Sequence, residues 1–195
     1  MKKYRIIPLI LAAVMALAPL TGCNGGNNTK NETPSASMNK QEGIAQTEIK
    51  AEIEEEKESN ETVFKLNSVI DSGKTDEEGN RYLYLDVSIT NNTDKEYELN
   101  ILNNFYVLYP DGEEAHFDVR TQLYAQNNME GYTTNPFTLT ANGTLNGMIG
   151  GFIIPPDKNE FTVCFFPTQD ILTDKESVIK VDVTAENIVK LNNNG

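Results

Sequence analysis

The sequence predicts an all-β protein, built as an antiparallel β-sandwich of seven or eight strands. Apolar and polar residues alternate along most of the segment 61–189, and a period of two is that of a half-buried strand. Short clusters of Gly, Pro, Asn and Asp separate the alternating stretches. Many short strands divided by such turn signals are typical of a sandwich.

The first strand is expected at 62–70, and the clearest one follows at 82–90. In the second of these, every other residue is aliphatic, which places on one face Leu83, Leu85, Val87 and Ile89. The opposite face carries Tyr82, Tyr84, Asp86, Ser88 and Thr90. Helical spacing would mix the two sets, so we expect a strand with its aliphatic face inward and its tyrosines outward.

Turn residues define two expected hairpins. Strands 105–109 and 113–119 flank Pro110-Asp111-Gly112, in which Pro favours a type I turn and Gly supplies the positive φ that follows. The segment 139–145 is expected to form a second hairpin around Asn142-Gly143.

The remaining strands are expected near the C-terminus. The strand that follows Asn142-Gly143 stops at Pro155-Pro156, because proline cannot donate to a ladder. Two more strands are expected at 161–166 and 178–184. The segment 121–135 has no clear period and is either a long loop or a short helix.

The first 22 residues read as an export signal. A basic start is followed by the apolar run 6–17, and the segment closes on small residues, the pattern of a secretory signal peptide. The apolar run is shorter than the roughly 20 residues that span a bilayer.

The sequence Leu20-Thr21-Gly22-Cys23 resembles the lipobox of bacterial lipoproteins at every position. The resemblance implies cleavage before Cys23, a diacylglyceryl thioether on its sulfur, and an acylated new amine. Several chains suit an anchor, since one acyl chain binds a membrane only marginally. The chain is then expected at the extracytoplasmic face of the cell membrane; the alternative is an ordinary secreted protein with a chance cysteine.

Composition divides the mature chain into an acidic linker at 23–60, which we expect to be disordered, the sandwich at 61–189 and a disordered tail at 190–195. The linker has no aromatic residue with which to build a core. The formal net charge of the whole chain is −13, and it becomes more negative when the signal leaves. Such a protein gains nothing from releasing the counterions of a nucleic acid, so nucleic-acid binding is excluded.

From about residue 62 to 186 the order of features resembles a telokin-like, immunoglobulin-like domain found in lipoproteins of Gram-positive bacteria. The resemblance is carried by three stretches, 85–93, 104–112 and 141–155, which are a strand ending in a polar turn, a hairpin with Asp-Gly, and a Gly-containing strand ending at Pro. The family usually has Pro-Gly where this chain has Asn142-Gly143, and 121–135 departs from its pattern. The resemblance implies an immunoglobulin-like sandwich and carries over no catalytic residue.

No set of residues suggests catalysis, a cofactor or a metal, and we expect a protein that is not an enzyme. His116 is the single histidine. It is interpreted as a surface strand residue, because the sequence has no serine in an activating turn from which a histidine base could take a proton. Cys164 is left alone once Cys23 is lipidated, so no intramolecular disulfide is expected, and its apolar strand indicates a packed thiol. Residues 71–79 fail the EF-hand template and are interpreted as a solvated turn, with a loose calcium site as the alternative.

The anchor and the sandwich favour a non-enzymatic binding or structural module at the cell surface. The alternative is a small-molecule or metal-binding accessory lipoprotein of a transporter or sensor system. If a protein partner binds, we expect it on an outward face formed by Tyr82, Tyr84 and Tyr106, because tyrosine is favoured at contact surfaces. The competing interpretation is that these rings pair across strands and shield the sheet.

Overall fold

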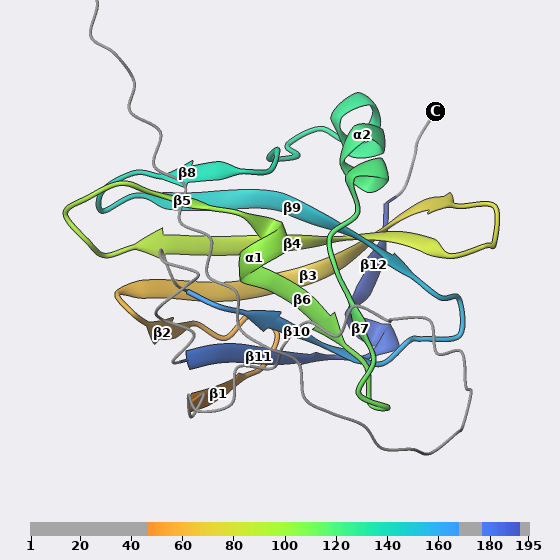
Figure 1. Cartoon of the computed structure of the whole chain (residues 1–195), viewed down its shortest axis with the longest axis horizontal. Coiled ribbons are helices and arrows are strands. Elements are labelled where there is room, and N and C mark those ends of the chain that lie inside the picture. The colour runs from red at the N-terminus through yellow and green to blue at the C-terminus, as the bar shows by residue number, and fades with distance from the viewer. Residues whose placement is uncertain (1–46, 168–176, 192–195) are drawn as a thin grey trace, which may run out of the picture. The chain divides into compact units, whose positions relative to one another are not determined.

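A computed structural model describes residues 47–167 and 177–191 of the chain (Figure 1). The expected signal peptide, the lipidation site Cys23 and residues 192–195 of the expected tail lie outside the described residues. Within the described part, no helix is long and apolar enough to cross a membrane.

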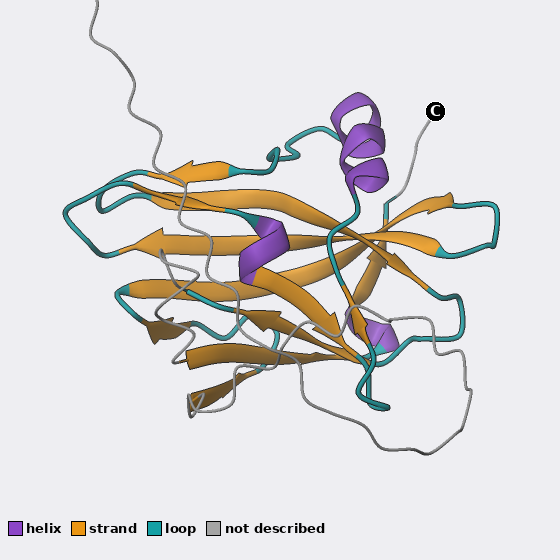
Figure 2. Cartoon of the chain, viewed as in Figure 1, coloured by secondary structure: helices purple, strands orange, loops and turns teal. Residues whose placement is uncertain are grey.

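The described chain is a β-sandwich with few helices (Figure 2), which confirms the predicted fold class. The first sheet has the order β1 (Thr47–Ala51), β11 (Ser177–Val183), β10 (Phe161–Phe165), β6 (Phe105–Leu108), β7 (Glu114–Ala115). The second has the order β12 (Ile188–Lys190), β3 (Thr62–Thr75), β4 (Arg81–Asn91), β9 (Thr144–Ile154), with β2 (Lys57–Ser59) also paired to β3. A small third sheet pairs β5 (Tyr97–Leu99) with β8 (Phe137–Leu139). The helical segments are α1 (Ile101–Asn104), α2 (Val119–Asn128) and the 3-10 turn η1 (Ala185–Asn187).

Most paired strands are antiparallel, as predicted, but two pairs are parallel: β1 with β11, and β12 with β3. Both involve a short strand near an end of the described domain. A sheet edge needs only backbone hydrogen bonds to accept a further strand, so a terminal segment can add to it in either direction.

The inner core fills the space between the two large sheets. The predicted inward face of β4 is confirmed, since its four aliphatic side chains are at most 1% exposed: Leu83, Leu85, Val87 and Ile89. Three phenylalanines from β3, β6 and β10 face them in one cluster. The ring of Phe165 lies 4.7 Å from those of both Phe64 and Phe105, measured between centroids.

One of the two expected hairpins is confirmed. Strands β6 and β7 pair with Val107 opposite Ala115, and Gly112 adopts a φ of +87° in the turn between them. The second expected hairpin is wrong, because β8 pairs with β5 while β9 pairs with β4. The turn at Asn142-Gly143 therefore carries the chain from one sheet to another.

The expected boundary between linker and domain is also wrong. Residues from 47 onward form β1 and β2, and β1 pairs with β11 along its whole length. Ala51 is buried, and Ile49 and Ile53 pack against the inner core. An aromatic-free segment can still supply an edge strand, because backbone hydrogen bonds and a few aliphatic contacts suffice. At the other end Lys190, expected in the tail, belongs to β12.

Cys164 lies in β10 and is fully buried, in a small cluster with Phe166 and Val178. Burial raises the pKa of its thiol to about 11. The predicted packed position of Cys164 is confirmed by this burial, and a thiol whose pKa is raised is a weaker nucleophile at neutral pH.

Helix α2 lies on the outer face of the second sheet (Figure 1). Asp118 caps it, accepting a hydrogen bond from the backbone N–H of Arg120 at 2.8 Å. The helix approaches β9 closely because Gly151 has no side chain: a Cβ there would lie 1.8 Å from the hydroxyl oxygen of Thr121. The backbone N–H of Asp118 also donates to the carbonyl oxygen of Gly151 at 3.0 Å.

The contact of α2 with β9 predicts that Gly151→Ala destabilises the protein by about 2–4 kcal/mol, since it adds a steric clash to backbone strain. Gly73→Ala is the matched control, because Gly73 also has a positive φ but nothing lies within 4 Å of the added Cβ. Urea unfolding of the two variants separates clash from strain. Equal losses would show that α2 does not depend on this contact.

The ordered segment 47–60 predicts that a chain beginning at Glu61 is less stable than one beginning at Thr47. The shorter chain loses the β1–β11 ladder and the contacts of Ile49, Ala51 and Ile53, so we expect a loss of at least about 2 kcal/mol. Thermal and urea unfolding of both chains measure it. If the two unfolding curves superimpose, residues 47–60 contribute no stability and belong with the linker.

Candidate binding cleft

The outer face of β4 is not an exposed tyrosine surface. Tyr82 and Tyr84 were expected to point outward into solvent, yet they are 7% and 0% exposed. They form a second core with Ala125 and Met129, which belong to α2 and its C-terminal end. The expectation is wrong because the period of β4 locates its two faces but does not show that a helix covers the outer one.

Hydrogen bonds and ring contacts attach Tyr82 and Tyr84 to helix α2 and to the segment that follows it. The Tyr84 hydroxyl donates to the carbonyl oxygen of Thr121 at 2.7 Å, and burial raises its pKa well above the ordinary value. Its ring meets that of Tyr132 edge to face at 5.8 Å, and Tyr82 meets Tyr124 in the same way at 6.0 Å. Tyr84 is therefore a structural residue.

Tyr106 is not brought together with the other two tyrosines. It lies on β6, in the first sheet, where its ring stacks on Phe166 at 5.6 Å. His116 follows β7 near the same ring, at 6.3 Å, and its Nε2 lies 3.3 Å from a carboxylate oxygen of Glu114. The side chain of His116 is half exposed, so its predicted surface position is confirmed.

A polar cleft of about 680 Å³ opens between the tip of the β3–β4 hairpin and the first turn of α2. Its walls carry both signs of charge and one aromatic ring. It is lined by Lys74, Thr75, Asp76, Glu77, Glu78, Tyr82 and Arg120.

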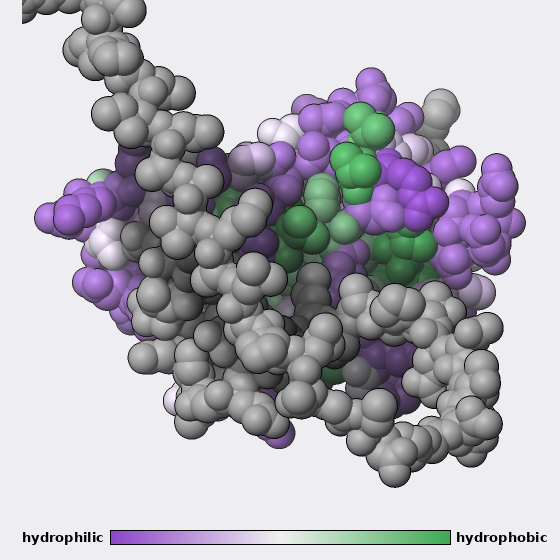
Figure 3. Space-filling view, in the orientation of Figure 1, coloured by the Kyte–Doolittle hydropathy of each residue, from purple (hydrophilic) through white to green (hydrophobic). Residues whose placement is uncertain are grey.

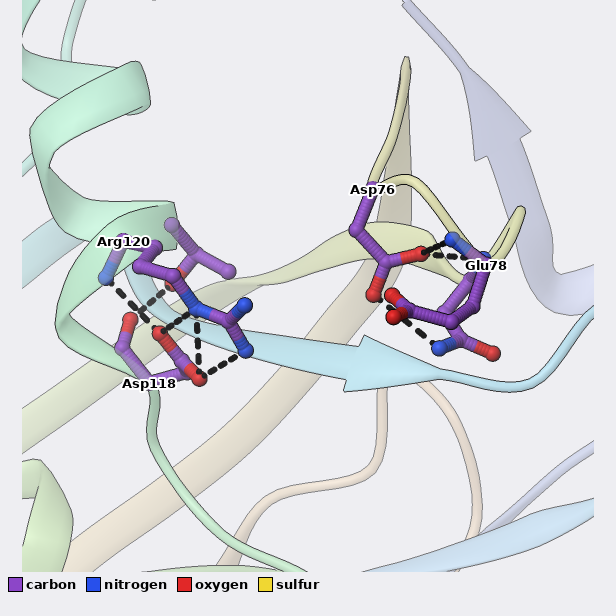
Figure 4. Close-up of polar contacts among 6 residues, drawn as sticks. Asp76, Glu78, Asp118 and Arg120 are labelled. Carbon is purple, nitrogen blue, oxygen red and sulfur yellow. Dashed lines mark hydrogen bonds and ion pairs between the residues drawn. The ribbon is translucent and has the colours of Figure 1, made fainter.

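One wall of the cleft is the turn that the sequence placed within 71–79. The Asp76 carboxylate accepts hydrogen bonds from the backbone N–H groups of Glu78 and Asn80 at 3.1 and 2.8 Å, and from the Asn80 amide at 3.0 Å (Figure 4). Burial raises the pKa of Asp76, but these hydrogen bonds outweigh it and the net shift is downward. Asp76 thus organises its own turn as an anion. In the described ranges 47–167 and 177–191, no three His, Cys, Asp or Glu side chains converge as a metal-binding group.

The other wall is the start of α2. The Arg120 guanidinium donates from Nε and Nη2 to the two carboxylate oxygens of Asp118, at 3.0 and 2.8 Å (Figure 4). This pairing lowers the pKa of Asp118 and raises that of Arg120. The charge of Arg120 is thereby largely compensated within its own helix turn.

Several side chains of the cleft remain available to a ligand. Lys74, Glu77 and Glu78 form no ion pair with any described residue. Tyr82 is nine-tenths buried, and its hydroxyl makes no hydrogen bond within the described part of the chain.

A second hollow, of about 400 Å³, lies beside Tyr109. The Tyr109 hydroxyl and Arg81 Nε are buried and have no hydrogen-bond partner among the described residues, and burial raises the pKa of Tyr109 to about 12. Because this hydroxyl is enclosed, a ligand in the hollow cannot reach it. The cleft beside α2 is therefore the stronger candidate.

Sequence reasoning missed the α2 wall of the cleft. Asp118 directly precedes the helix, and an aspartate at that point is an N-cap signal. That signal could have identified a helix from residue 119, but not the hairpin tip that Arg120 faces.

Solved structures similar to this chain include the following three. The yjhA protein of Bacillus subtilis is 17% identical, with a TM-score of 0.48, and the match covers 68% of this chain and 98% of that one. The ycdA protein of Bacillus subtilis subsp. subtilis str. 168, described as a candidate lipoprotein, is 16% identical with a TM-score of 0.48, over 67% of this chain and 38% of that one. An uncharacterized β-sandwich protein of Clostridium difficile 630 is 15% identical with a TM-score of 0.41, over 73% and 99%.

No curated protein matches the chain. A family model does match it, over residues 51–178, which is more than half of the sequence and most of the sandwich. The chain therefore belongs to the family described as "Domain of unknown function (DUF4352)".

Proposed function

We propose that this protein is a membrane-anchored extracytoplasmic lipoprotein that presents a non-enzymatic, immunoglobulin-like binding module of the telokin-like type. The observation that carries the anchor is the sequence Leu20-Thr21-Gly22-Cys23 at the end of an export signal. The first strand of the sandwich begins at Thr47, so residues 24–46 are available as a spacer between the lipid and the domain.

The chemistry of the cleft supports binding rather than catalysis. General acid–base and nucleophilic catalysis need a reactive side chain within hydrogen-bond reach of a partner that activates it. Here Asp76 closes its own turn, and Asp118 and Arg120 compensate each other. Lys74, Glu77 and Glu78 have no ion-pair partner among the described residues that could activate them. The single histidine pairs with Glu114 outside the cleft.

The size of the cleft favours a second candidate function, a small-molecule accessory lipoprotein of a transporter or sensor system. A volume of about 680 Å³ lies in the range of roughly 300–1,000 Å³ that holds small ligands. Such pockets are mostly apolar, however, whereas this lining is mostly charged. We therefore favour a partner that contacts more than the cleft.

The proposed anchor predicts that Cys23→Ala abolishes lipid attachment and releases the protein from the membrane fraction. Metabolic labelling with radioactive palmitate, followed by fractionation, measures both effects. Cys164→Ala is the matched control: Cys164 is buried in β10, so its variant should keep label and membrane association. Equal labelling of the Cys23→Ala protein would disprove the anchor.

A further inference from the structure

We propose that the cleft and the adjoining outward face of α2 form one docking surface for a cationic, amphipathic peptide segment of a partner protein. A Lys or Arg side chain of that segment enters the cleft, and its apolar side chains lie on α2. The inference rests on the proposed function, because it gives the binding module a partner of stated chemistry.

The first support is Tyr82, which is 7% exposed and lines the cleft. Its hydroxyl makes no hydrogen bond with any described residue and is not among the enclosed polar atoms, so it is open to the cleft although most of the side chain is buried. A phenol oxygen can accept a hydrogen bond from an ammonium or guanidinium group. An accessible acceptor on a largely buried ring in the lining of an open cleft offers such a group a fixed position to bind.

The second support is charge. Figure 4 shows the Asp118–Arg120 pair on one side of the cleft and the Asp76 turn, with Glu78, on the other. Asp118 compensates Arg120, which leaves Lys74 against three carboxylates on the hairpin. The net charge of the cleft lining is therefore negative, and so is the formal net charge of the whole chain, −13. A cation is therefore attracted both by the cleft and by the field around it.

The third support is an apolar ridge on α2, formed by Val119 and Leu123. These side chains are 58% and 57% exposed, and residues four apart share one face of a helix. Figure 3 shows hydrophobic side chains over α2, with hydrophilic ones between them and the β3–β4 hairpin. Arg120 lies three residues before Leu123, so the ridge and the cleft are contiguous.

These supports together favour a peptide over other occupants. A metal ion or a small amine would fill the cleft but leave the ridge in water. A second copy of this chain would bring two strongly acidic surfaces together. A segment that combines basic and aliphatic side chains satisfies the acceptors and covers the ridge at once.

The test is fluorescence anisotropy of a short labelled lysine–leucine peptide, titrated with the full chain in a non-ionic detergent. Wild type and variants are measured in the same detergent at the same concentration. Binding of the peptide to detergent is therefore equal in every titration and does not affect the difference in affinity between proteins. We expect Glu77→Gln with Glu78→Gln, Leu123→Ser, and Tyr82→Phe each to weaken binding by about tenfold, as the loss of a charged hydrogen bond or a buried anchor does. Each variant is first shown to melt as wild type does; the hairpin and ridge variants are at exposed positions, so the inference does not depend on Tyr82→Phe alone.

The matched control is Glu96→Gln with Glu98→Gln, which removes the same charge from exposed positions on and next to β5 and should change affinity less than twofold. If the hairpin variant loses no more affinity than this control, attraction is non-specific and the inference fails. It also fails if a lysine–serine peptide binds as tightly as the lysine–leucine peptide, or if lysine amide alone competes equally well. If the chain takes up palmitate but does not bind the peptide, this inference fails and the proposed anchor stands. If the chain binds the peptide but takes up no palmitate, the anchor fails and this inference stands.

Discussion

Strand β4 is buried on both of its faces over residues 82–85, and the rest of the described domain depends on this double burial. Its aliphatic side packs between the two large sheets, and its tyrosine side lies under α2. Over residues 82–85 every side chain of β4 is buried, and β4 pairs with β3 along one edge and with β9 along the other. The same packing fixes α2 against β9 and so sets the distance between α2 and the β3–β4 hairpin. The cleft exists because both of its walls are attached to this strand.

Helix α2 packs on β4 with few apolar side chains. Helix α2 is polar over most of its length, and its buried contacts come mainly from Thr121 and Ala125, with Met129 at its end. Such a helix would be marginal alone, because short helices gain most of their stability from packing. The two aromatic edge contacts and the hydrogen bond from Tyr84 to Thr121 supply specific attachment. The side chains that α2 leaves outward, Val119 and Leu123, are therefore free of any role in this packing.

The sequence was informative where one local rule decides the structure. The period of two located the inner face of β4, and Pro110-Asp111-Gly112 located a hairpin, because both signals act over a few neighbouring residues. Prediction from the sequence failed where a strand pairs with a strand that is distant along the chain. Asn142-Gly143 is a good hairpin signal, but its flanking strands found different partners. The segment 47–60 lacks aromatics and becomes ordered only because β11 and β3 offer edges far along the chain.

The candidate site shows the same limit. Residues 71–79 were singled out as a polar turn with a loose calcium site as the alternative, and the turn is one wall of the cleft. Arg120 and Asp118 were not singled out, since nothing local indicates that α2 faces that turn. Tyr82 was singled out as an exposed contact residue; its ring is buried instead, while its hydroxyl stays unpaired at the cleft.

The acidity of the domain and its exposed aliphatic ridge are best understood together. An apolar ridge on a surface module favours self-association, and a module held near a membrane is also drawn to anionic headgroups if it is basic. A formal charge of −13 opposes both encounters, because like surfaces repel one another and the headgroups repel the domain. The same charge lowers the barrier for a cationic partner, whose approach is accelerated rather than opposed. The negative charge thus opposes self-association through the exposed ridge and favours cationic surfaces among those that could cover it.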